Sequence, residues 1–245
     1  MLQPIWTGKP ETASRLRGRI ERVLDAAKAQ GYRSGENPAR WRGHLDHLLP
    51  RPAKLSRGHH KAMRFEDVSD FVLKLRQRQS MAALALEFLI YTAARSGEVR
   101  RAMWSELDLE ARLWVIPAAR MKAGRMHRVP LTDRPLEILA RLRPLAGSES
   151  ETPVFPSSNG KTLSDAAFSA LLTRMGGAGR AFTPHGFRSS FRDWAGELTD
   201  FPRELAETAL AHVVGDATER AYRRGDALEK RRTMMDAWAA YIEPT

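Results

Sequence analysis

Hydrophobic residues recur at helical spacing over most of this chain. Between residues 12 and 30, Leu16, Ile20, Val23 and Ala27 fall on one face, and the arginines lie largely off it. The same reasoning predicts further helices at residues 38–48, 65–77, 80–94, 132–142, 164–175, 183–198, 202–212, 218–224 and 228–242. Residues 95–104 are expected to continue helically after a break at Gly97.

Short apolar runs in the middle of the chain follow a different pattern. Residues 113–116 and 126–131 predict two strands, with a turn near residues 121–124 between them, and residues 153–155 predict another short strand. The expected fold class is therefore α+β: mainly α with a small antiparallel β-sheet.

A basic linker interrupts the pattern at residues 49–61, whose sequence is LPRPAKLSRGHHK. We expect a domain boundary there, with residues 1–55 before it and residues 56–245 after it. The first part is too small to be a stable domain by itself, so it is interpreted as the remnant of a larger one.

Composition narrows the class of protein. The 245 residues include 40 Lys and Arg against 29 Asp and Glu, a net charge of +11 that favours a polyanionic partner. The absence of cysteine excludes disulfides, thiolate catalysis and cysteine zinc sites. The apolar run at residues 81–94 is too short to span a bilayer and contains Glu87, and the first ten residues do not read as a signal peptide. We expect a soluble intracellular protein.

Several residues could carry phosphodiester chemistry without a metal or cofactor, for which no ligand motif is present. His185 and Arg188 share a helix face in TPHGFRSSFRDW, and Arg95 follows an apolar helix with Glu98 three residues on. Ordinary structural explanations exist for each: a helix cap, an exposed arginine and a local Arg95–Glu98 ion pair.

Three more candidates are Lys122, near the tip of the predicted hairpin, and His212 and Tyr222, ten residues apart. A lysine on a turn is usually solvated, but one delivered to a leaving oxygen can act as an acid. A tyrosine on a short helix is usually a half-buried aromatic residue, but three arginines surround Tyr222 in TERAYRRGD.

Taken together and in order, these residues resemble the signature of the tyrosine recombinase family. That signature is Arg, Lys, His-x-x-Arg, His or Trp, then Tyr; here it reads Arg95, Lys122, His185 with Arg188, His212 in LAH, and Tyr222. The stretches NPARWRGHL, TAARSGEV, RMKAGRMHRVPL and RRTMMDAWAAY are similar to those of integrases from prophages and genomic islands.

The resemblance implies a site-specific DNA recombinase with the integrase catalytic-domain fold. Tyr222 would attack the scissile phosphate and form a 3′-phosphotyrosyl intermediate, without ATP, metal or another cofactor. Arg95 and Arg188 would clamp the non-bridging oxygens, and Glu98 would hold Arg95.

The remaining roles follow from the same resemblance. His185 would accept the tyrosine proton, His212 would donate to a phosphate oxygen, and Lys122 would protonate the 5′ leaving oxygen. An accessory DNA-binding protein without strand transfer and a type IB topoisomerase are the alternatives.

The implied partners are double-stranded DNA attachment sites and further copies of the chain, assembled as a homo-tetramer in the cytoplasm of a bacterial host. Helix 228–242 carries an apolar stripe that includes Met234 and Trp238. The stripe either packs on its own core or, as the family suggests, docks on a neighbouring protomer. Residues 1–55 match only the C-terminal part of a core-binding domain, so the chain is expected to be N-terminally shortened.

Overall fold

The computed structural model describes residues 2–51, 61–145, 152–176, 182–212 and 225–244. The chain divides into two compact units, Met1–Gly58 and His59–Thr245. Among the described residues, no helix has the length and apolar character needed to cross a membrane.

The first unit is a helical hairpin-like fragment held by a few polar contacts. It contains α1 (Gln3–Trp6), α2 (Pro10–Ala29) and a short 3-10 turn, η1 (Leu45–His47). Trp6 stacks on Trp41 with ring centroids 5.5 Å apart, and its indole nitrogen donates to the Pro50 carbonyl at 2.8 Å. The helix predicted at residues 38–48 is wrong: turns occupy that stretch, and Gly43 has a φ of 71°, which a helix does not allow.

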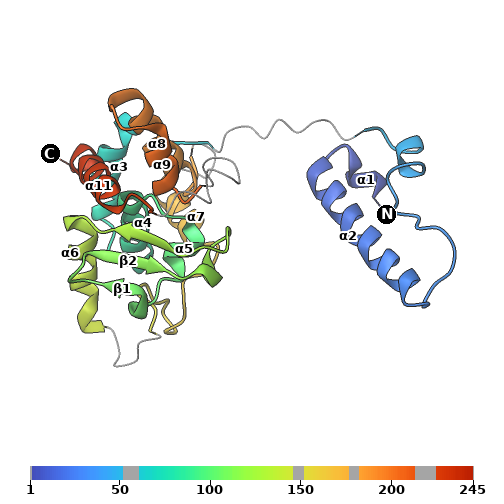
Figure 1. Ribbon diagram of the computed structural model, residues 1–245, viewed down its shortest axis with the longest axis horizontal. Helices are drawn as coiled ribbons and strands as arrows, with labels where there is room; N and C mark the ends of the chain where they lie inside the picture. The colour runs from blue at the N-terminus through green and yellow to red at the C-terminus, as the bar shows by residue number, and fades with distance from the viewer. Residues whose placement is uncertain (1, 52–60, 146–151, 177–181, 213–224, 245) are drawn as a thin grey trace. The chain divides into compact units, whose positions relative to one another are not determined.

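The second unit is mainly helical with one small sheet, which confirms the expected fold class (Figure 1). Its helices are α3 (Val68–Arg76), α4 (Met81–Thr92), α5 (Ser96–Arg100), α6 (Asp133–Leu142), α7 (Ala167–Arg174), α8 (Gly186–Leu198), α9 (Arg203–Ala209) and α11 (Leu228–Ile242). Its strands are β1 (Leu107–Asp108), β2 (Leu113–Ile116) and β3 (His127–Pro130), and its 3-10 turns are η2 (Phe65–Asp67), η3 (Trp104–Glu106), η4 (Ala118–Arg120) and η5 (Arg143–Leu145).

The sheet is antiparallel in the order β1-β2-β3, with Ile116 paired to His127 at the loop end of the β2–β3 hairpin. The predicted strand at residues 153–155 is reduced to a single bridge between Met103 and Pro153. The helix predicted at residues 218–224 lies outside the described residues.

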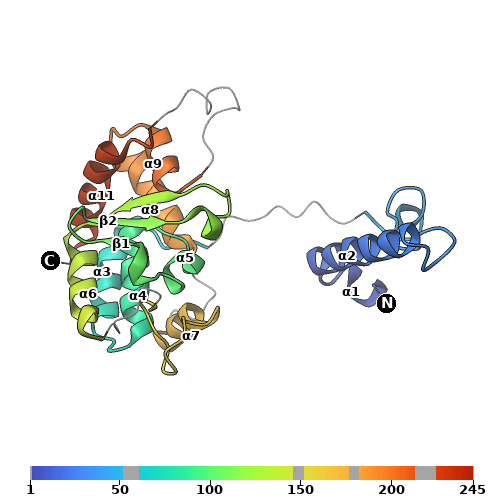
Figure 2. The same ribbon diagram turned by 60° about the horizontal axis from the view of Figure 1, so that its bottom comes forward.

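Helix α4 is the centre of the second unit. It is apolar around most of its circumference, and it contacts α3, α5, α6, α7 and α11. The Ser80 hydroxyl caps it by accepting from the Ala83 N–H at 3.2 Å. Figure 2 shows the sheet lying along one side of this helix.

The chain reverses between α4 and α5 at a left-handed residue. Ala93 has a φ of 50°, after which Arg95 is extended and α5 begins at Ser96. The break predicted at Gly97 is therefore misplaced, because Gly97 lies inside α5. The Glu98 carboxylate accepts from the Arg95 N–H at 2.8 Å and so caps the new helix.

Helix α11 packs on its own unit. Met234, Met235, Trp238 and Ile242 are all buried, and the Trp238 indole donates to the Ile90 carbonyl at 2.9 Å. Just after the helix, the Glu243 carboxylate accepts from the Tyr91 hydroxyl at 2.5 Å and pairs with Arg76. Of the two alternatives for the apolar stripe, the structure shows packing on the core of the same chain.

Candidate functional site

Arg188 is the most deeply buried of the candidate residues. The hydroxyl of Thr183 accepts from the Gly186 N–H at 3.1 Å at the start of α8, and Arg188 follows in the first turn with 4% of its surface exposed. Its Nη1 donates to the Ala93 carbonyl and its Nη2 to the Leu210 carbonyl, both at 2.5 Å. Its Nε is buried without a hydrogen-bond acceptor.

No carboxylate pairs directly with Arg188 among the described residues. Burial, and then repulsion by Arg95, lower the pKa of Arg188 to about 10, although Glu98 and Glu207 partly offset this. A buried cation with an unsatisfied donor is costly unless an anion completes its contacts. This guanidinium is thus suited to bind an anionic ligand.

Arg95 approaches the same backbone turn from α5. Its Nη1 pairs with Glu98 Oε1 at 2.8 Å, and Glu98 is itself only 6% exposed. Its Nη2 donates to the carbonyls of Leu210 at 3.3 Å and Ala211 at 3.1 Å. Both guanidiniums therefore meet at the Leu210 carbonyl, just after α9.

His212 joins this cluster from the end of that turn. Its Nε2 lies 3.2 Å from Arg188 Nη2, and its Nδ1 lies 2.5 Å from Glu207 Oε2. Because a guanidinium only donates, Nε2 must be the acceptor in this arrangement. The ring proton therefore sits on Nδ1 and is donated to Glu207.

Glu207 is a site residue that the sequence did not suggest. Burial raises its pKa, but the hydrogen bond from His212 and the charges of Arg192 and Arg203 outweigh burial and keep the pKa below its ordinary value. Glu207 precedes His212 by five positions, and that spacing does not signal a shared helix face. Only the turn after α9 brings the two together.

His185 lies at the start of α8, exposed to solvent and one turn before Arg188. The segment from Lys61 to Met63 crosses this helix start: the Lys61 carbonyl accepts from the Thr183 N–H at 3.0 Å. A Cβ on Gly186 would lie 2.4 Å from that same carbonyl, so only glycine fits beside His185. No pattern in the sequence signals this need for glycine.

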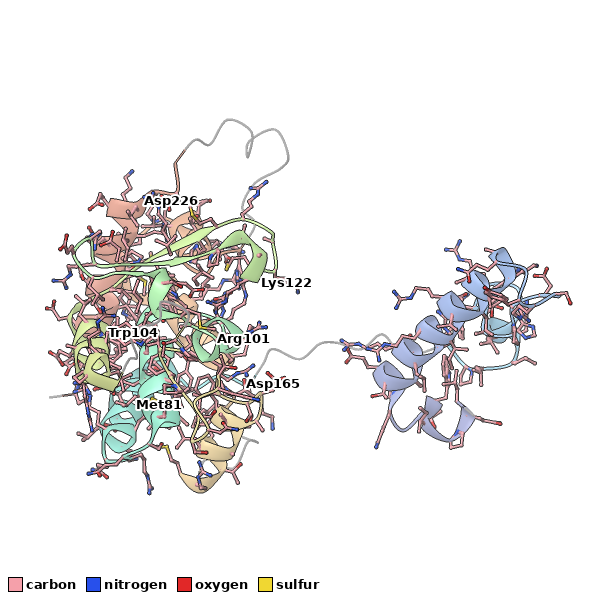
Figure 3. The ribbon with its side chains drawn as sticks, turned by 90° about the horizontal axis from the view of Figure 1, so that it is seen from below. Met81, Arg101, Trp104, Lys122, Asp165 and Asp226 are labelled. Atoms are coloured by element: carbon pink, nitrogen blue, oxygen red, sulfur yellow. The ribbon has the colours of Figure 1, made fainter. Side chains whose placement is uncertain are left out.

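Lys122 lies on the connection between η4 and β3, where it is exposed and makes no hydrogen bond or ion pair with another described residue (Figure 3). The start of this connection is tied to the site, because Arg120 Nη2 donates to the Glu98 carbonyl at 2.5 Å and Arg120 also pairs with buried Glu106. Lys122 is two residues farther on, within about 7 Å of Arg120 along the chain.

His127, at the start of β3, faces the same charged region. Burial first, and then repulsion by Arg231 and Arg188, lower the pKa of His127 to about 4, against the opposing effects of Glu98 and the Ala209 backbone. The ring is therefore neutral at physiological pH. The sequence analysis did not single it out.

Tyr222 lies outside the described residues. Of the other tyrosines, Tyr91 is buried against Glu243 and Tyr241 stacks on Trp238, whereas Tyr32 belongs to the first unit. Within the described part of the chain, no group of three His, Asp or Glu residues is placed to hold a metal ion. The structure thus gathers Arg95, Arg188 and His212 directly and places His185 one helical turn away.

Comparison with known proteins gives matches along the chain. A model described as "Phage integrase family" matches residues 61–228, and one described as "Phage integrase central domain" matches residues 1–44. The prophage integrase IntA of Escherichia coli K12 is 40% identical over 156 residues, which are 63% of this chain and 37% of IntA. Prophage integrase IntZ of the same strain is 31% identical over 238 residues, which are 96% of this chain and 56% of IntZ.

Solved structures share the fold. A lambda integrase dimer bound to a COC′ core site gives a TM-score of 0.61 at 20% identity, covering 91% of this chain and 62% of that chain. A lambda integrase tetramer bound to a Holliday junction gives 0.60 at 19% identity, covering 92% of this chain and 63% of that one. The chain spans well under two thirds of the length of IntA and IntZ. The family match covers more than half of the residues, and so this chain belongs to the phage integrase family.

Proposed function

We propose that this chain is the DNA-cleaving part of a site-specific recombinase that works through a covalent bond between DNA and Tyr222. The observation that carries the proposal is the buried guanidinium of Arg188, which meets Arg95 and His212 at one turn and lacks a carboxylate partner. For a basic protein of the phage integrase family, the anion expected at such a site is a phosphate of the DNA backbone.

The cleavage step transfers a phosphodiester without an external energy source. The phenol oxygen of Tyr222 attacks the phosphorus, the bond from phosphorus to the 5′ oxygen breaks, and the 3′ phosphate stays on the tyrosine. The phenol proton passes to His185, and the leaving 5′ oxygen takes a proton from Lys122. Attack by a 5′-hydroxyl of another strand reverses the step and rejoins the DNA.

The cations lower the barrier by neutralising the extra charge of the pentavalent transition state. Arg95 and Arg188 each offer paired N–H groups that match two phosphate oxygens. With phosphate present, His212 would donate from Nε2 while Glu207 stabilises the charged ring through Nδ1, a contact already made at 2.5 Å. Glu98 would hold Arg95 by the 2.8 Å pair.

The tyrosine assignment is supported by exclusion of Tyr91 and Tyr241, the two described tyrosines of the second unit. Tyr91 is 1% exposed and bonded to Glu243, so its oxygen is not available to attack DNA. Tyr241 packs in an aromatic cluster with Trp194 and Trp238. Tyr222 follows His212 by ten residues, which keeps it within about 35 Å of the cluster along the chain.

The assembly and the domain roles are part of the same proposal. The first unit is interpreted as the C-terminal part of a core-binding domain, supported by the central-domain match at residues 1–44. DNA attachment sites are the expected substrate, and four copies on DNA are the expected assembly, by analogy with the lambda integrase tetramer bound to a Holliday junction. The net charge of +11 favours such a partner.

The test uses a nicked suicide duplex that carries the junction sequence at the boundary of the genomic element encoding the chain. The protein should form an adduct with this DNA that resists detergent, and Tyr222→Phe should form none while binding the DNA with nearly unchanged affinity. An adduct from Tyr222→Phe would contradict the nucleophile assignment. Binding without any adduct from the unaltered chain would favour an accessory DNA-binding protein instead.

A further inference from the structure

A second buried arginine in the same unit has a partner for each of its donor groups. The Arg231 side chain, in α11, is 1% exposed. Its Nη2 contacts Asp226 Oδ2 at 2.6 Å, its Nε donates to the Asp226 carbonyl at 2.7 Å, and its Nη1 donates to the Arg128 carbonyl at 2.5 Å. One guanidinium therefore fixes both the side chain and the backbone of Asp226.

Arg128, on strand β3, donates to the same carboxylate. Its Nε donates to Asp226 Oδ2 at 3.0 Å and its Nη2 to Oδ1 at 2.5 Å, a two-point contact that fixes direction as well as distance. Despite the cost of its burial, the pKa of Asp226 is held below its ordinary value by Arg128 and Arg231. We call Arg128, Asp226 and Arg231 the Asp226 clamp.

The clamp lies close to Tyr222 in the sequence. Asp226 follows Tyr222 by four residues, so the two Cα atoms can be no more than about 14 Å apart. On the N-terminal side, His212 precedes Tyr222 by ten residues, so these two Cα atoms can be as much as about 35 Å apart. The clamp is therefore the tighter of the two restraints on where Tyr222 can lie.

The clamp also touches the strand that leads back to Lys122. Arg128 follows Lys122 by six residues, on β3, and Arg231 holds the carbonyl of that same Arg128. In Figure 3, Lys122 lies on the loop that joins β2 to β3, and Asp226 lies just before α11. The Asp226 carboxylate thus links strand β3, which follows Lys122 in the sequence, to the residues that follow Tyr222.

We propose that the Asp226 clamp is a positioning device that sets the attack geometry of Tyr222 from the β-sheet side. This inference rests on the proposed function, because it takes Tyr222 as the nucleophile. The clamp acts without contacting the phosphate, because it fixes Asp226, which follows Tyr222 by four residues. A misplacement of about 1 Å in a reacting group can cost roughly 100-fold in rate.

The main variant is Arg128→Gln, because this side chain is 38% exposed and its loss leaves the buried Arg231–Asp226 pair intact. The matched control is Arg112→Gln, which breaks another Arg–Asp pair at the edge of the same sheet, with Asp133. Arg128→Lys is the second variant: it keeps the charge and loses the two-point contact.

The assay measures single-turnover adduct formation by the full chain at saturating suicide DNA, with either oxygen or sulfur at the bridging 5′ position. A 5′ thiolate leaves without an acid, so sulfur compensates for loss of Lys122 but not for a misplaced Tyr222. Thermal unfolding and DNA affinity are measured alongside.

The clamp predicts that Arg128→Gln forms adduct about 10- to 100-fold more slowly on both substrates, with DNA affinity unchanged. Arg128→Lys should show a smaller loss, and Arg112→Gln should match the unaltered chain. An unchanged rate in Arg128→Gln would overturn the inference. Recovery of that variant on the sulfur substrate would overturn it too, because the defect would then act through Lys122. If Tyr222→Phe still formed adduct, the proposed function itself would fail instead.

Discussion

Two buried arginines in the second unit differ in what neutralises them. Arg231 is buried against the Asp226 carboxylate and two backbone carbonyls, so each of its donor groups has an acceptor. Arg188 is buried against two carbonyls and a histidine ring, with its Nε left unsatisfied. Burial lowers the pKa of both, but only Arg231 has a directly paired carboxylate to compensate.

The difference separates a structural arginine from one prepared for a ligand. A buried ion pair with all contacts made is part of the folded framework. A buried guanidinium without a carboxylate is kept at a cost that an incoming phosphate would remove. Substitution of the two residues should therefore differ in its effect on stability: loss of Arg231 should destabilise the fold far more than loss of Arg188.

The largest effect is expected from Arg188→Gln. Loss of one phosphate-binding donor group should slow adduct formation by roughly 100- to 1,000-fold. The free energy of unfolding should change by no more than about 1 kcal/mol, because removal of a buried charge without a carboxylate partner offsets the loss of its contacts with the Ala93 and Leu210 carbonyls. Adduct kinetics and urea unfolding of the same preparation check both parts, and a large loss of stability with a normal rate would reverse the comparison.

Arg231→Gln should act mainly on stability, and because Arg231 belongs to the Asp226 clamp it should also slow adduct formation. Removing it leaves Asp226 with only Arg128 and leaves the Arg128 carbonyl without its donor. We expect the free energy of unfolding to fall by about 3 kcal/mol, as in other broken buried pairs. Urea unfolding at pH 7 measures the loss; a stability equal to that of the unaltered chain would show that the Asp226 clamp does not hold the fold.

Acid sensitivity should come partly from His127. Its pKa in the folded chain, about 4, lies below the value of about 6.5 expected in the unfolded chain. The unfolded chain therefore binds a proton between these pH values and the folded chain does not, so the contribution is complete above pH 6.5 and is lost as the pH falls toward 4.

The loss amounts to at most about 3 kcal/mol. In His127→Gln, the free energy of unfolding should fall less between pH 7 and pH 4 than in the unaltered chain. Chemical unfolding at several pH values provides the measurement. Parallel pH curves for the two proteins would contradict the buried, neutral state of His127.

The smallest effect is expected from Glu207→Gln. The neutral amide can still accept from His212 Nδ1, but it no longer stabilises a charged ring. Adduct formation should slow by about 10-fold, with Glu204→Gln on the same helix as a control that leaves the rate unchanged. Equal rates for the two variants would separate Glu207 from the chemistry.

Much of the fold could be predicted because it depends on local periodicity. The apolar stripe of α11 gave its observed bounds, Leu228–Ile242, and the β2–β3 hairpin lies where its two apolar runs indicated. The stretch at residues 38–48 fails as a helix because Gly43 adopts a left-handed conformation, and the break expected at Gly97 occurs at Ala93. Local pattern does not reveal which residue will take a positive φ unless it is glycine.

The candidate site could be predicted only in part. Arg95, Arg188 and His212 were expected together, and the structure brings them to the turn after α9. Glu207 and the Asp226 clamp were not expected. Arg128 and Asp226 are 98 positions apart, and their pairing follows from how α11 packs on β3, which no spacing rule encodes. His185, Lys122 and Tyr222 keep their roles as proposals.

The central claim is that the phosphate held by Arg95 and Arg188 becomes bonded to Tyr222. The most direct measurement is mass spectrometry of the trapped adduct after trypsin digestion and removal of the DNA down to a single nucleotide. The account predicts a single nucleotide, linked through its 3′ phosphate, on the peptide Ala221–Arg223, which contains Tyr222. A modification on Tyr32, Tyr91 or Tyr241, or on a residue that is not tyrosine, would contradict it.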